Sequence, residues 1–360
     1  ACPVSLRRVN PDLNRLQAYP FERLAALKAG VTPPAHLPHI ALSIGEPKHP
    51  PPAFVLEVLR GALAGVGSYP ATAGLPELRS ACASWLQRRF GLPAERIGAA
   101  QVLPVNGTRE ALFAIAQAVV DRTQPKPLVA MPNPFYQIYE GATLLSGAEP
   151  YYVANTADND FAADWDSVPE QVWASTQLLF VCSPGNPTGK IMPLEEWKKL
   201  FELSEKYGFV IASDECYSEI YFRDEPPLCG LEAASLLGYK DFKRLIAFTS
   251  LSKRSNVPGL RSGFVAGDAA ILKDFLLYRT YHGCAMSGVV QAASIAAWND
   301  EAHVIENRNL YRTKFGQVTP VLAKVMYVKL PDASFYLWAG VPAAWHNSDT
   351  DFARELSAAE

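Results

Sequence analysis

The sequence lacks the features that define several classes of protein. None of its six cysteines forms a C-x-x-C pair and no His/Cys cluster has zinc spacing, so we expect no metal site. The net charge is only −3 and no long run carries one sign, which disfavours nucleic acid as a partner. No stretch reaches the ~18 uninterrupted apolar residues of a membrane span. Residues 1–10, with the pair Arg7-Arg8, lack the apolar core of a signal peptide.

Two further absences narrow the function. No G-x-G-x-x-G follows a predicted strand, which disfavours a dinucleotide-binding oxidoreductase. The cysteines at Cys182 and Cys216 lie in apolar, strand-like runs, where a buried free thiol is the ordinary interpretation. We therefore expect a reduced, cytoplasmic enzyme.

The 360 residues, of which 49 % are apolar, suffice for one large domain and a smaller one. Short apolar runs alternate with amphipathic segments, which predicts a mostly parallel sheet covered on both faces. From about Ser287 the pattern changes to a long helical stretch, followed by Met326–Leu330 and Phe335–Trp338, and predicts a small α+β unit. The expected strands are 101–105, 128–131, 178–182, 209–212, 245–249 and 264–266, and the expected helices are 75–90, 108–120, 135–145, 194–207 and 270–278.

Ligands of open parallel sheets bind beyond the carboxyl ends of the strands, and three groups of residues follow strands in the first half of the chain. Asn106-Gly107-Thr108-Arg109 opens a helix, whose free N–H groups bind phosphate, although an ordinary turn with Thr108 as N-cap is the alternative. Tyr136 could stack on a flat heterocycle or simply pack in the core. Pro184–Gly189 fixes an unusual turn with Asn186 at its tip, where a plain loop is the alternative.

Two more groups follow later strands. Asp214 closes an apolar run, so its carboxylate needs a cation or a donor, with Tyr217 one turn on; a helix-capping aspartate is the alternative. Ser250-Leu251-Ser252-Lys253, with Arg261 eight residues later, combines a phosphate site with an amine that could form an imine with an aldehyde cofactor. A solvated surface lysine is the alternative there.

As a set, Asn-Pro-Thr-Gly, Asp-x-x-Tyr and Ser-x-Ser-Lys followed by Arg261 are highly specific, and the chain resembles the class I/II aminotransferases of fold type I from about Tyr19 to Tyr336. The resemblance implies pyridoxal 5'-phosphate as cofactor and an α/β fold with a mostly parallel seven-stranded sheet between helices plus a small α+β domain. It divides the chain into an N-terminal arm with part of the small domain (1–49), a large cofactor-binding domain (50–285) and a C-terminal small domain (286–360).

The resemblance also implies roles for single residues. Lys253 is the lysine that joins the cofactor, Asp214 pairs with its ring nitrogen and Tyr136 stacks on its ring. The ring oxygen and the phosphate are held by Asn186, Tyr217, Gly107, Thr108, Ser250, Ser252 and Arg261. Tyr69 matches the tyrosine that reaches the phosphate of a neighbouring subunit, which implies a homodimer with shared active sites. Arg254, beside the lysine, is expected to add positive potential.

The substrates implied are small amino acids and oxo acids. The segment from Gly45 to Pro52 looks like the succinyldiaminopimelate aminotransferases of lysine biosynthesis, with glutamate as amino donor. Gly45 and Asn186 are expected to contact the substrate, and Lys48 to recognise a distal anionic group; a solvated lysine is the alternative. A broad aspartate or aromatic aminotransferase and a C–S β-lyase remain open, whereas a cofactor-sensing regulator is disfavoured because residues before Tyr19 cannot hold a DNA-binding domain.

The end of the chain departs from the family pattern. Family members continue for some tens of residues past Phe335-Tyr336-Leu337-Trp338 and carry there an arginine that clamps the substrate α-carboxylate. Only residues 339–360 remain here, and Arg354 looks like part of an exposed helix, so the clamp role is not assigned to it. We expect a shortened small domain in which cofactor binding survives better than turnover.

Overall fold

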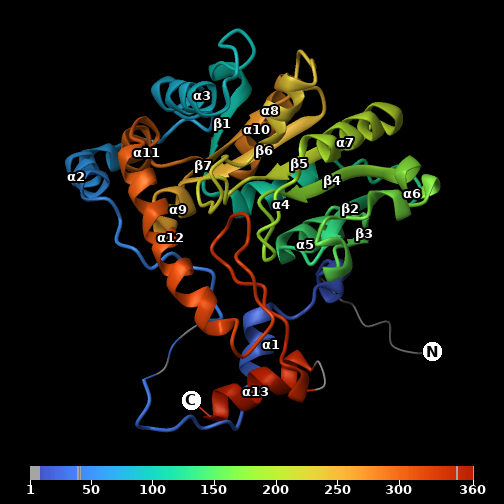
Figure 1. Cartoon of the computed structure of the whole chain (residues 1–360). Helices are drawn as coiled ribbons and strands as arrows, with labels where there is room; N and C mark the ends of the chain where they lie inside the picture. Colours follow the sequence, from blue (N-terminus) through green and yellow to red (C-terminus); the bar gives the residue numbers. More distant parts are fainter. Residues whose placement is uncertain (1–8, 39, 41, 346–347, 360) are drawn as a thin grey trace, which may run out of the picture.

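A seven-stranded sheet forms the centre of the computed structural model, which describes residues 9–38, 40, 42–345 and 348–359 (Figure 1). Cys2 and the pair Arg7-Arg8 lie outside the described residues. The strand order is β1-β7-β6-β5-β4-β2-β3; β7 is antiparallel to both its neighbours and all other pairs are parallel. The strands are β1 (Val102–Val105), β2 (Leu128–Asn133), β3 (Glu149–Ala154), β4 (Thr176–Cys182), β5 (Val210–Asp214), β6 (Leu245–Ser250) and β7 (Gly263–Gly267).

The sequence pattern predicted six of these strands and missed β3. The six are apolar and almost wholly buried, so their runs stand out in the sequence. Strand β3 is an edge strand that pairs only with β2, and most of its residues are partly or fully exposed. It therefore carries polar and aromatic residues, Glu149-Pro150-Tyr151-Tyr152, in place of a continuous apolar run.

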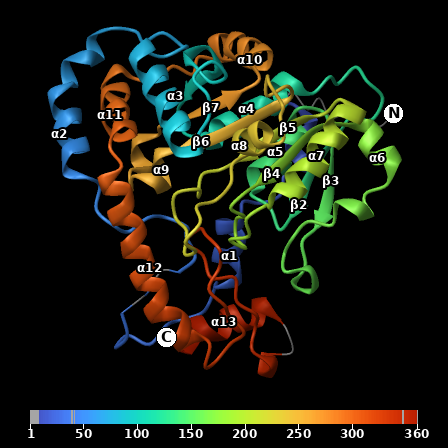
Figure 2. The same cartoon turned by 45° about the horizontal axis from the view of Figure 1, so that its top comes forward.

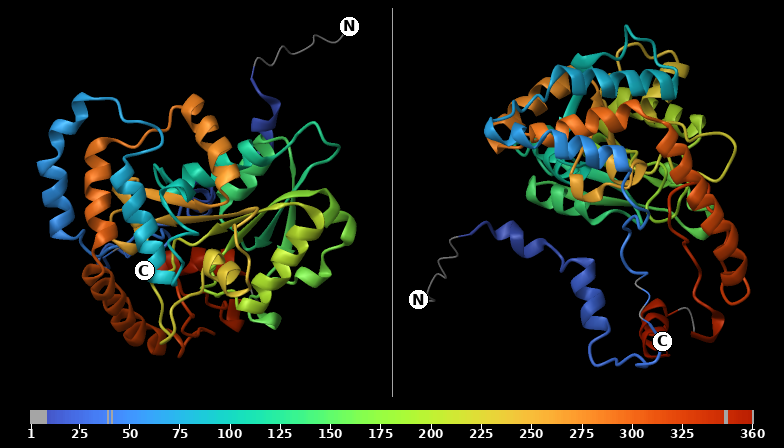
Figure 3. Two further views of the ribbon diagram at one scale, coloured as in Figure 1. Left: turned by 90° about the horizontal axis from the view of Figure 1, so that it is seen from above. Right: turned by 90° about the vertical axis from the view of Figure 1, so that its left-hand side faces the viewer.

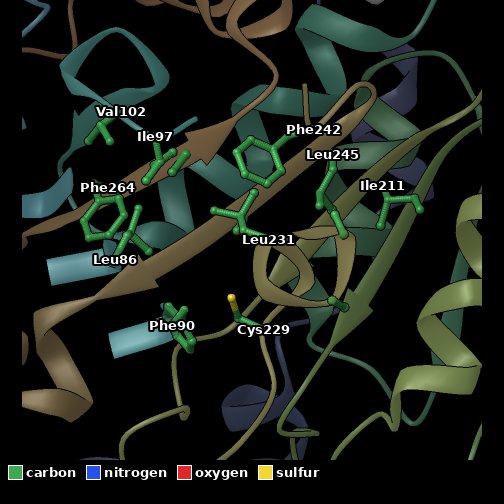
Figure 4. Packing of buried hydrophobic residues seen from close by; sticks show 14 of the residues in the cluster. Leu86, Phe90, Ile97, Val102, Ile211, Cys229, Leu231, Phe242, Leu245 and Phe264 are labelled. Carbon is green, nitrogen blue, oxygen red and sulfur yellow. The ribbon is translucent and has the colours of Figure 1, made fainter. Parts of the chain in front are cut away.

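Helices cover both faces of the sheet, as the view from above shows (Figure 3). One face packs against α3, α7, α8 and α11 and the other against α4, α5 and α10, and the inward side chains alternate along each strand. Figure 4 shows the first of these layers, where Phe264 and Val102 of the strands meet Leu86 of α3. The helices are α1 (Pro20–Leu27), α2 (Ala53–Gly61), α3 (Pro76–Phe90), α4 (Thr108–Val119), α5 (Gln137–Leu145), α6 (Glu170–Ser175), α7 (Leu194–Tyr207), α8 (Gly230–Leu236), α9 (Leu251–Arg254), α10 (Ala269–His282), α11 (Gly288–Asn299), α12 (Ala302–Leu322) and α13 (Asp349–Ala359).

The long helix α12 leaves the sheet layers and runs towards α1 and α13 (Figures 1 and 2). There Arg354 of α13 donates a hydrogen bond to the carbonyl of Leu27 in α1 at 2.9 Å, which ties the two ends of the described chain together. The segments 326–330 and 335–338, expected to supply strands to this small unit, do not form strands: Tyr327 makes an isolated bridge with Gly340, and no described residue of 335–338 is part of a bridge. A further isolated bridge joins Ala333, between the two segments, to Tyr221.

The division of the chain at residues 49 and 285 stays a prediction; α11, which lies beyond 285, packs against α2 and α3. Within the described part of the chain, no helix has the length and hydropathy needed to cross a membrane.

Candidate active site

A pocket of about 350 Å³ gathers the polar residues that follow the strands. It is lined by Thr108, Arg109, Tyr136, Asn186, Asp214, Cys216, Tyr217, Ser250, Ser252, Lys253 and Arg261. The five groups singled out in the sequence, which are spread from Asn106 to Arg261, thus meet at one place, as expected for the carboxyl ends of neighbouring parallel strands.

One end of the pocket is built for an anion. Gly107 caps helix α4 with a φ of +81°, and a Cβ at this position would lie 2.1 Å from Nη2 of Arg261. Only glycine therefore lets the arginine approach the start of the helix, where backbone N–H groups are free to bind negative charge. Nearby, the Ser250 hydroxyl accepts the N–H of Ser252 at 3.1 Å and donates to its hydroxyl at 2.9 Å.

The buried carboxylate of Asp214 lies at the end of β5. Its Oδ2 accepts a hydrogen bond from the Tyr139 hydroxyl at 2.8 Å, and its Oδ1 accepts one from the Cys216 N–H at 3.3 Å. Burial raises the pKa of Asp214, while these hydrogen bonds and the charge of Lys253 act in the opposite direction. The sequence analysis assigned a role to Tyr136 but none to Tyr139. The position of Tyr139 one helical turn after Tyr136 could have indicated that both residues lie on the side of α5 that faces the pocket.

Tyr217, at another edge of the pocket, forms a hydrogen bond with a second tyrosine, Tyr336. The hydroxyls of Tyr217 and Tyr336 lie 2.9 Å apart, and the ring of Phe335 meets Tyr217 edge-on at 5.4 Å. Burial raises the pKa of Tyr217, and the neighbouring Tyr336 raises it further. Residues 335 and 336 thus reach the pocket from the far end of the chain, which the sequence pattern had not indicated.

Lys253 lies on the short helix α9 and its amine points to the carbonyl of Gly45 at 3.3 Å. Burial lowers the pKa of this lysine, against the opposing influence of Cys216 and Asp214, so more of the amine is neutral near pH 7 than for a surface lysine. Gly45, from the N-terminal segment, is therefore next to the pocket.

Arg254 does not join Lys253 in the pocket, contrary to the expectation from its position. Its guanidinium is buried, donates to the Ala297 carbonyl at 2.7 Å and pairs with Glu301. It also lies over the rings of Trp298 and Trp85. The charge of Arg254 is thus used in packing α9 against α11 and α3.

Arg109 and Tyr136 form the remaining wall. Nε of Arg109 donates to the Tyr136 hydroxyl at 2.8 Å, which holds the aromatic ring at the pocket. Burial raises the pKa of Tyr136 to about 12, and the arginine opposes this shift. Arg109 and Cys216 are lining residues that the sequence did not assign a role.

Two predicted site residues lie away from the pocket. The Lys48 side chain is 67 % exposed, and its amine pairs with Glu46 at 2.5 Å. Tyr69 is fully exposed in the single chain. A contact of Tyr69 with a cofactor would therefore require a second copy of the chain.

The donor set fits pyridoxal phosphate. A glycine-opened helix start with Arg261 and two serines suits the phosphate, the buried Asp214 suits a protonated ring nitrogen, and the amine of Lys253, whose pKa burial lowers, suits the aldehyde. No group of three or more His, Cys, Asp or Glu side chains placed to hold a metal ion occurs among the residues with described positions.

Known proteins that resemble this chain over most of its length also use this kind of site. Residues 38–360 match the family model for aminotransferases of class I and II. An LL-diaminopimelate aminotransferase of Dehalococcoides mccartyi is 32 % identical over 321 residues, which cover 88 % of this chain and 80 % of the relative. A crystal structure of an aminotransferase from Neisseria meningitidis Z2491 is 54 % identical with a TM-score of 0.90, and covers 97 % of this chain and 87 % of its own.

A second solved structure, aminotransferase AspB from Helicobacter pylori 26695, is 35 % identical with a TM-score of 0.87 and matches 96 % of this chain and 87 % of its own. The family, the fold and the donor set of the pocket agree. The chain belongs to the class I and II aminotransferases, enzymes that transfer amino groups with pyridoxal phosphate.

Proposed function

We propose that this aminotransferase moves an amino group from glutamate to N-succinyl-2-amino-6-oxopimelate, which gives N-succinyl-LL-2,6-diaminopimelate in lysine biosynthesis. The observation that carries the proposal is the charge of the pocket, where Lys253, Arg109 and Arg261 face a single carboxylate, Asp214. Such a pocket suits a phosphate and an anionic substrate together. Relatives named LL-diaminopimelate aminotransferase support a substrate with this carbon skeleton. We place the activity in the cytoplasm.

The proposed binding roles follow the geometry of the pocket. Arg261, Gly107, Thr108 and the two serines hold the phosphate, Asp214 holds the ring nitrogen, Tyr217 and Asn186 hold the ring oxygen and Tyr136 covers one ring face. Asn186 and Gly45 also lie where a substrate carboxylate would meet the amine of Lys253. Pyridoxal phosphate supplies, when bound, a ring that withdraws electrons from the substrate α-carbon.

The chain supplies the proton transfer. Burial lowers the pKa of Lys253 and so favours its neutral amine, which would take the proton from the substrate α-carbon and deliver it to the carbon that was the cofactor's aldehyde. Asp214 would pair with the ring nitrogen, and the hydrogen bonds from Tyr139 and Cys216 to its two oxygens favour its charged form against the burial that raises its pKa.

Lys48 is proposed to bind the distal anionic group of the substrate. Its amine is on the same segment as Gly45 and is held by Glu46, so a substrate carboxylate would exchange with that of Glu46. We expect Lys48→Ala to lower kcat/KM for the N-succinylated substrate by up to roughly fivefold, as for loss of a solvent-exposed ion pair. Unchanged efficiency of Lys48→Ala with that substrate would contradict the role.

A homodimer with shared active sites is part of the proposal. Tyr69 is fully exposed, and Leu63 and Val66 beside it are 59 % and 73 % exposed, so this surface is apolar and free for a second copy. Mixing the inactive variants Lys253→Ala and Tyr69→Ala tests the sharing. If each site needs Tyr69 from the partner, mixed dimers recover part of the activity; a mixture no more active than its components contradicts the sharing.

The substrate is tested by product analysis with glutamate and a set of oxo acids. The proposal predicts the highest kcat/KM with N-succinyl-2-amino-6-oxopimelate. A higher value with the unsuccinylated diaminopimelate skeleton, or with the oxo acids of aspartate or the aromatic amino acids, would replace it by those activities. Release of pyruvate and a thiol from a cysteine conjugate would instead indicate a C–S β-lyase.

A further inference from the structure

A buried polar cluster lies next to Lys253 but outside the pocket. It joins three segments of the chain: His49 from the N-terminal segment, Asn256 from the turn after α9, and Asn307 from α12. Oδ1 of Asn307 lies 2.9 Å from Nδ1 of His49 and 2.8 Å from Nδ2 of Asn256. Its Nδ2 donates to the main-chain carbonyl of Lys253 at 3.2 Å. The amide of Asn307 is thus the centre of the cluster.

The hydrogen-bond directions follow from the two ends of this amide. Because Nδ2 of Asn307 donates to Lys253, its Oδ1 must accept from both other partners, so His49 carries its proton on Nδ1. Nε2 of His49 and Oδ1 of Asn256 are then buried acceptors, and neither has a partner among the described residues. The amide of Asn307 thus has a fixed orientation, with its oxygen accepting from two segments and its nitrogen donating to a third.

The Lys253 carbonyl, which accepts a hydrogen bond from Asn307, has no hydrogen-bond partner within its own helix, α9. Helix α9 has only four residues, Leu251–Arg254, and the last carbonyls of a helix have no partner within it. The N–H of Ser255 closes back onto Leu251, which leaves the carbonyl of Lys253 to Asn307. The main chain that carries the reactive amine is therefore anchored to α12 and not by its own helix.

His49 is also linked to the pocket residue Tyr217 through a series of aromatic rings. Its ring lies 4.5 Å from that of Tyr311 on α12, which stacks on Phe335 at 5.7 Å and 11°. Phe335 in turn meets Tyr217 edge-on at 5.4 Å. One histidine thus begins a polar route to Lys253 and an aromatic route to Tyr217. Gly45 accepts a hydrogen bond from the amine of Lys253, and His49 reaches the main chain of the lysine through Asn307, so the segment 45–49 is linked to both parts of Lys253.

We propose that His49 and Asn307 are positioning residues for the transamination step, which hold the main chain of Lys253 in place and couple it to α12 and to the segment 45–49. The inference rests on the proposed role of Lys253 as the base. A small displacement of a reacting group lowers the rate strongly, by about 100-fold for about 1 Å. Neither residue is among those that line the pocket, so we expect them to act on the rate and not on substrate binding.

The test uses the cofactor-loaded enzyme and two substitutions. His49→Phe keeps a ring against Tyr311 but removes the hydrogen bond, and Asn307→Leu removes the hold on Lys253. The double variant replaces His49 and Asn307 by apolar groups together, so the ring of residue 49 no longer faces an unpaired amide oxygen. Asn309→Leu, an exposed position on the same helix, is the matched control.

We expect Asn307→Leu and the double variant to lower kcat at least about tenfold with KM within about twofold of the wild type. The pH midpoint of the absorbance of the lysine-bound cofactor should also shift, because this absorbance reports on the nitrogen that Lys253 supplies, and a loosened main chain changes the surroundings of that nitrogen. His49→Phe should show the same changes to a smaller degree, and Asn309→Leu none.

Three results would overturn the inference. The first is a double variant with wild-type kcat and an unchanged pH midpoint. The second is a loss of thermal stability alone, with both readouts unchanged, since this would make the cluster a purely structural one. The third is an equal effect in Asn309→Leu. A wrong assignment of Lys253 as the cofactor-binding lysine would be recognised separately, because Lys253→Ala would then leave the absorbance of the cofactor unaltered.

Discussion

Tyr139 offers the sharpest test of how the pocket holds its cofactor. Its hydroxyl is fully buried and donates to Oδ2 of Asp214 at 2.8 Å, and its ring lies parallel to that of Phe180 at 4.6 Å. Tyr139→Phe removes the donor and keeps the stacked ring. Asp214 then retains the longer bond from the Cys216 N–H, at 3.3 Å.

The size of the effect follows from the kind of bond that is lost. A hydrogen bond to a charged group contributes about 1.5–3 kcal/mol, and each 1.4 kcal/mol corresponds to about tenfold in affinity. The pKa of Asp214, already raised by burial, rises further without the donor, so less carboxylate is present to pair with the ring nitrogen. We therefore expect Tyr139→Phe to raise the dissociation constant of pyridoxal phosphate roughly tenfold to 150-fold.

The assay is titration of the cofactor-free protein with pyridoxal phosphate, followed by absorbance. Tyr207→Phe is the matched control, because Tyr207 also donates to a carboxylate, that of Glu170 at 2.9 Å, but at a partly buried position of α7 that does not line the pocket. This control should leave the dissociation constant unchanged. An affinity of Tyr139→Phe equal to that of the wild type would refute the view that Tyr139 keeps Asp214 charged.

Further predictions concern stability and the phosphate end. Burial raises the pKa of Glu215 from 4.5 to about 7. The folded state therefore gains stability from the protonated Glu215 below pH 4.5, and this gain is lost as the pH rises through about 7. The free energy of unfolding falls by roughly 3 kcal/mol over this range. Urea unfolding of cofactor-free Glu215→Gln should lack this decline, and a decline as steep as that of the wild type would contradict it. Gly107→Ala combines a φ of +81° with a Cβ placed 2.1 Å from Nη2 of Arg261, so we expect at least about tenfold weaker cofactor binding; Gly208→Ala, which also has positive φ but open space around it, is the control.

The sequence predicted the parts of the fold whose residues are buried on both sides. Strands such as β5 and β6 are continuous apolar runs, and the polar residues that follow them, Asp214 and Lys253, do meet in the pocket. The sequence pattern did not predict the edge strand β3, because this strand is half exposed and so lacks an apolar run. The strands expected at 326–330 and 335–338 are not formed: Tyr327 makes one isolated bridge, with Gly340, and the described residues 335–338 make none.

The missing parts of the site depend on contacts between distant segments. The bond between Tyr139 and Asp214 joins α5 to β5, and that between Asn307 and the carbonyl of Lys253 joins α12 to α9. No local pattern encodes such pairs, because each side chain also has an ordinary interpretation as core or surface. The direction in which Arg254 points was likewise set by Trp85, Trp298 and Glu301, which lie far from it in sequence.

The central claim is that Lys253 joins the cofactor and handles the proton of the substrate. The most direct measurement is the visible absorbance of the purified protein with pyridoxal phosphate, before and after glutamate is added. The account predicts a band of lysine-bound cofactor that shifts with glutamate and is absent in Lys253→Ala. A band that persists in Lys253→Ala, or one that glutamate leaves unmoved in the wild type, would contradict it.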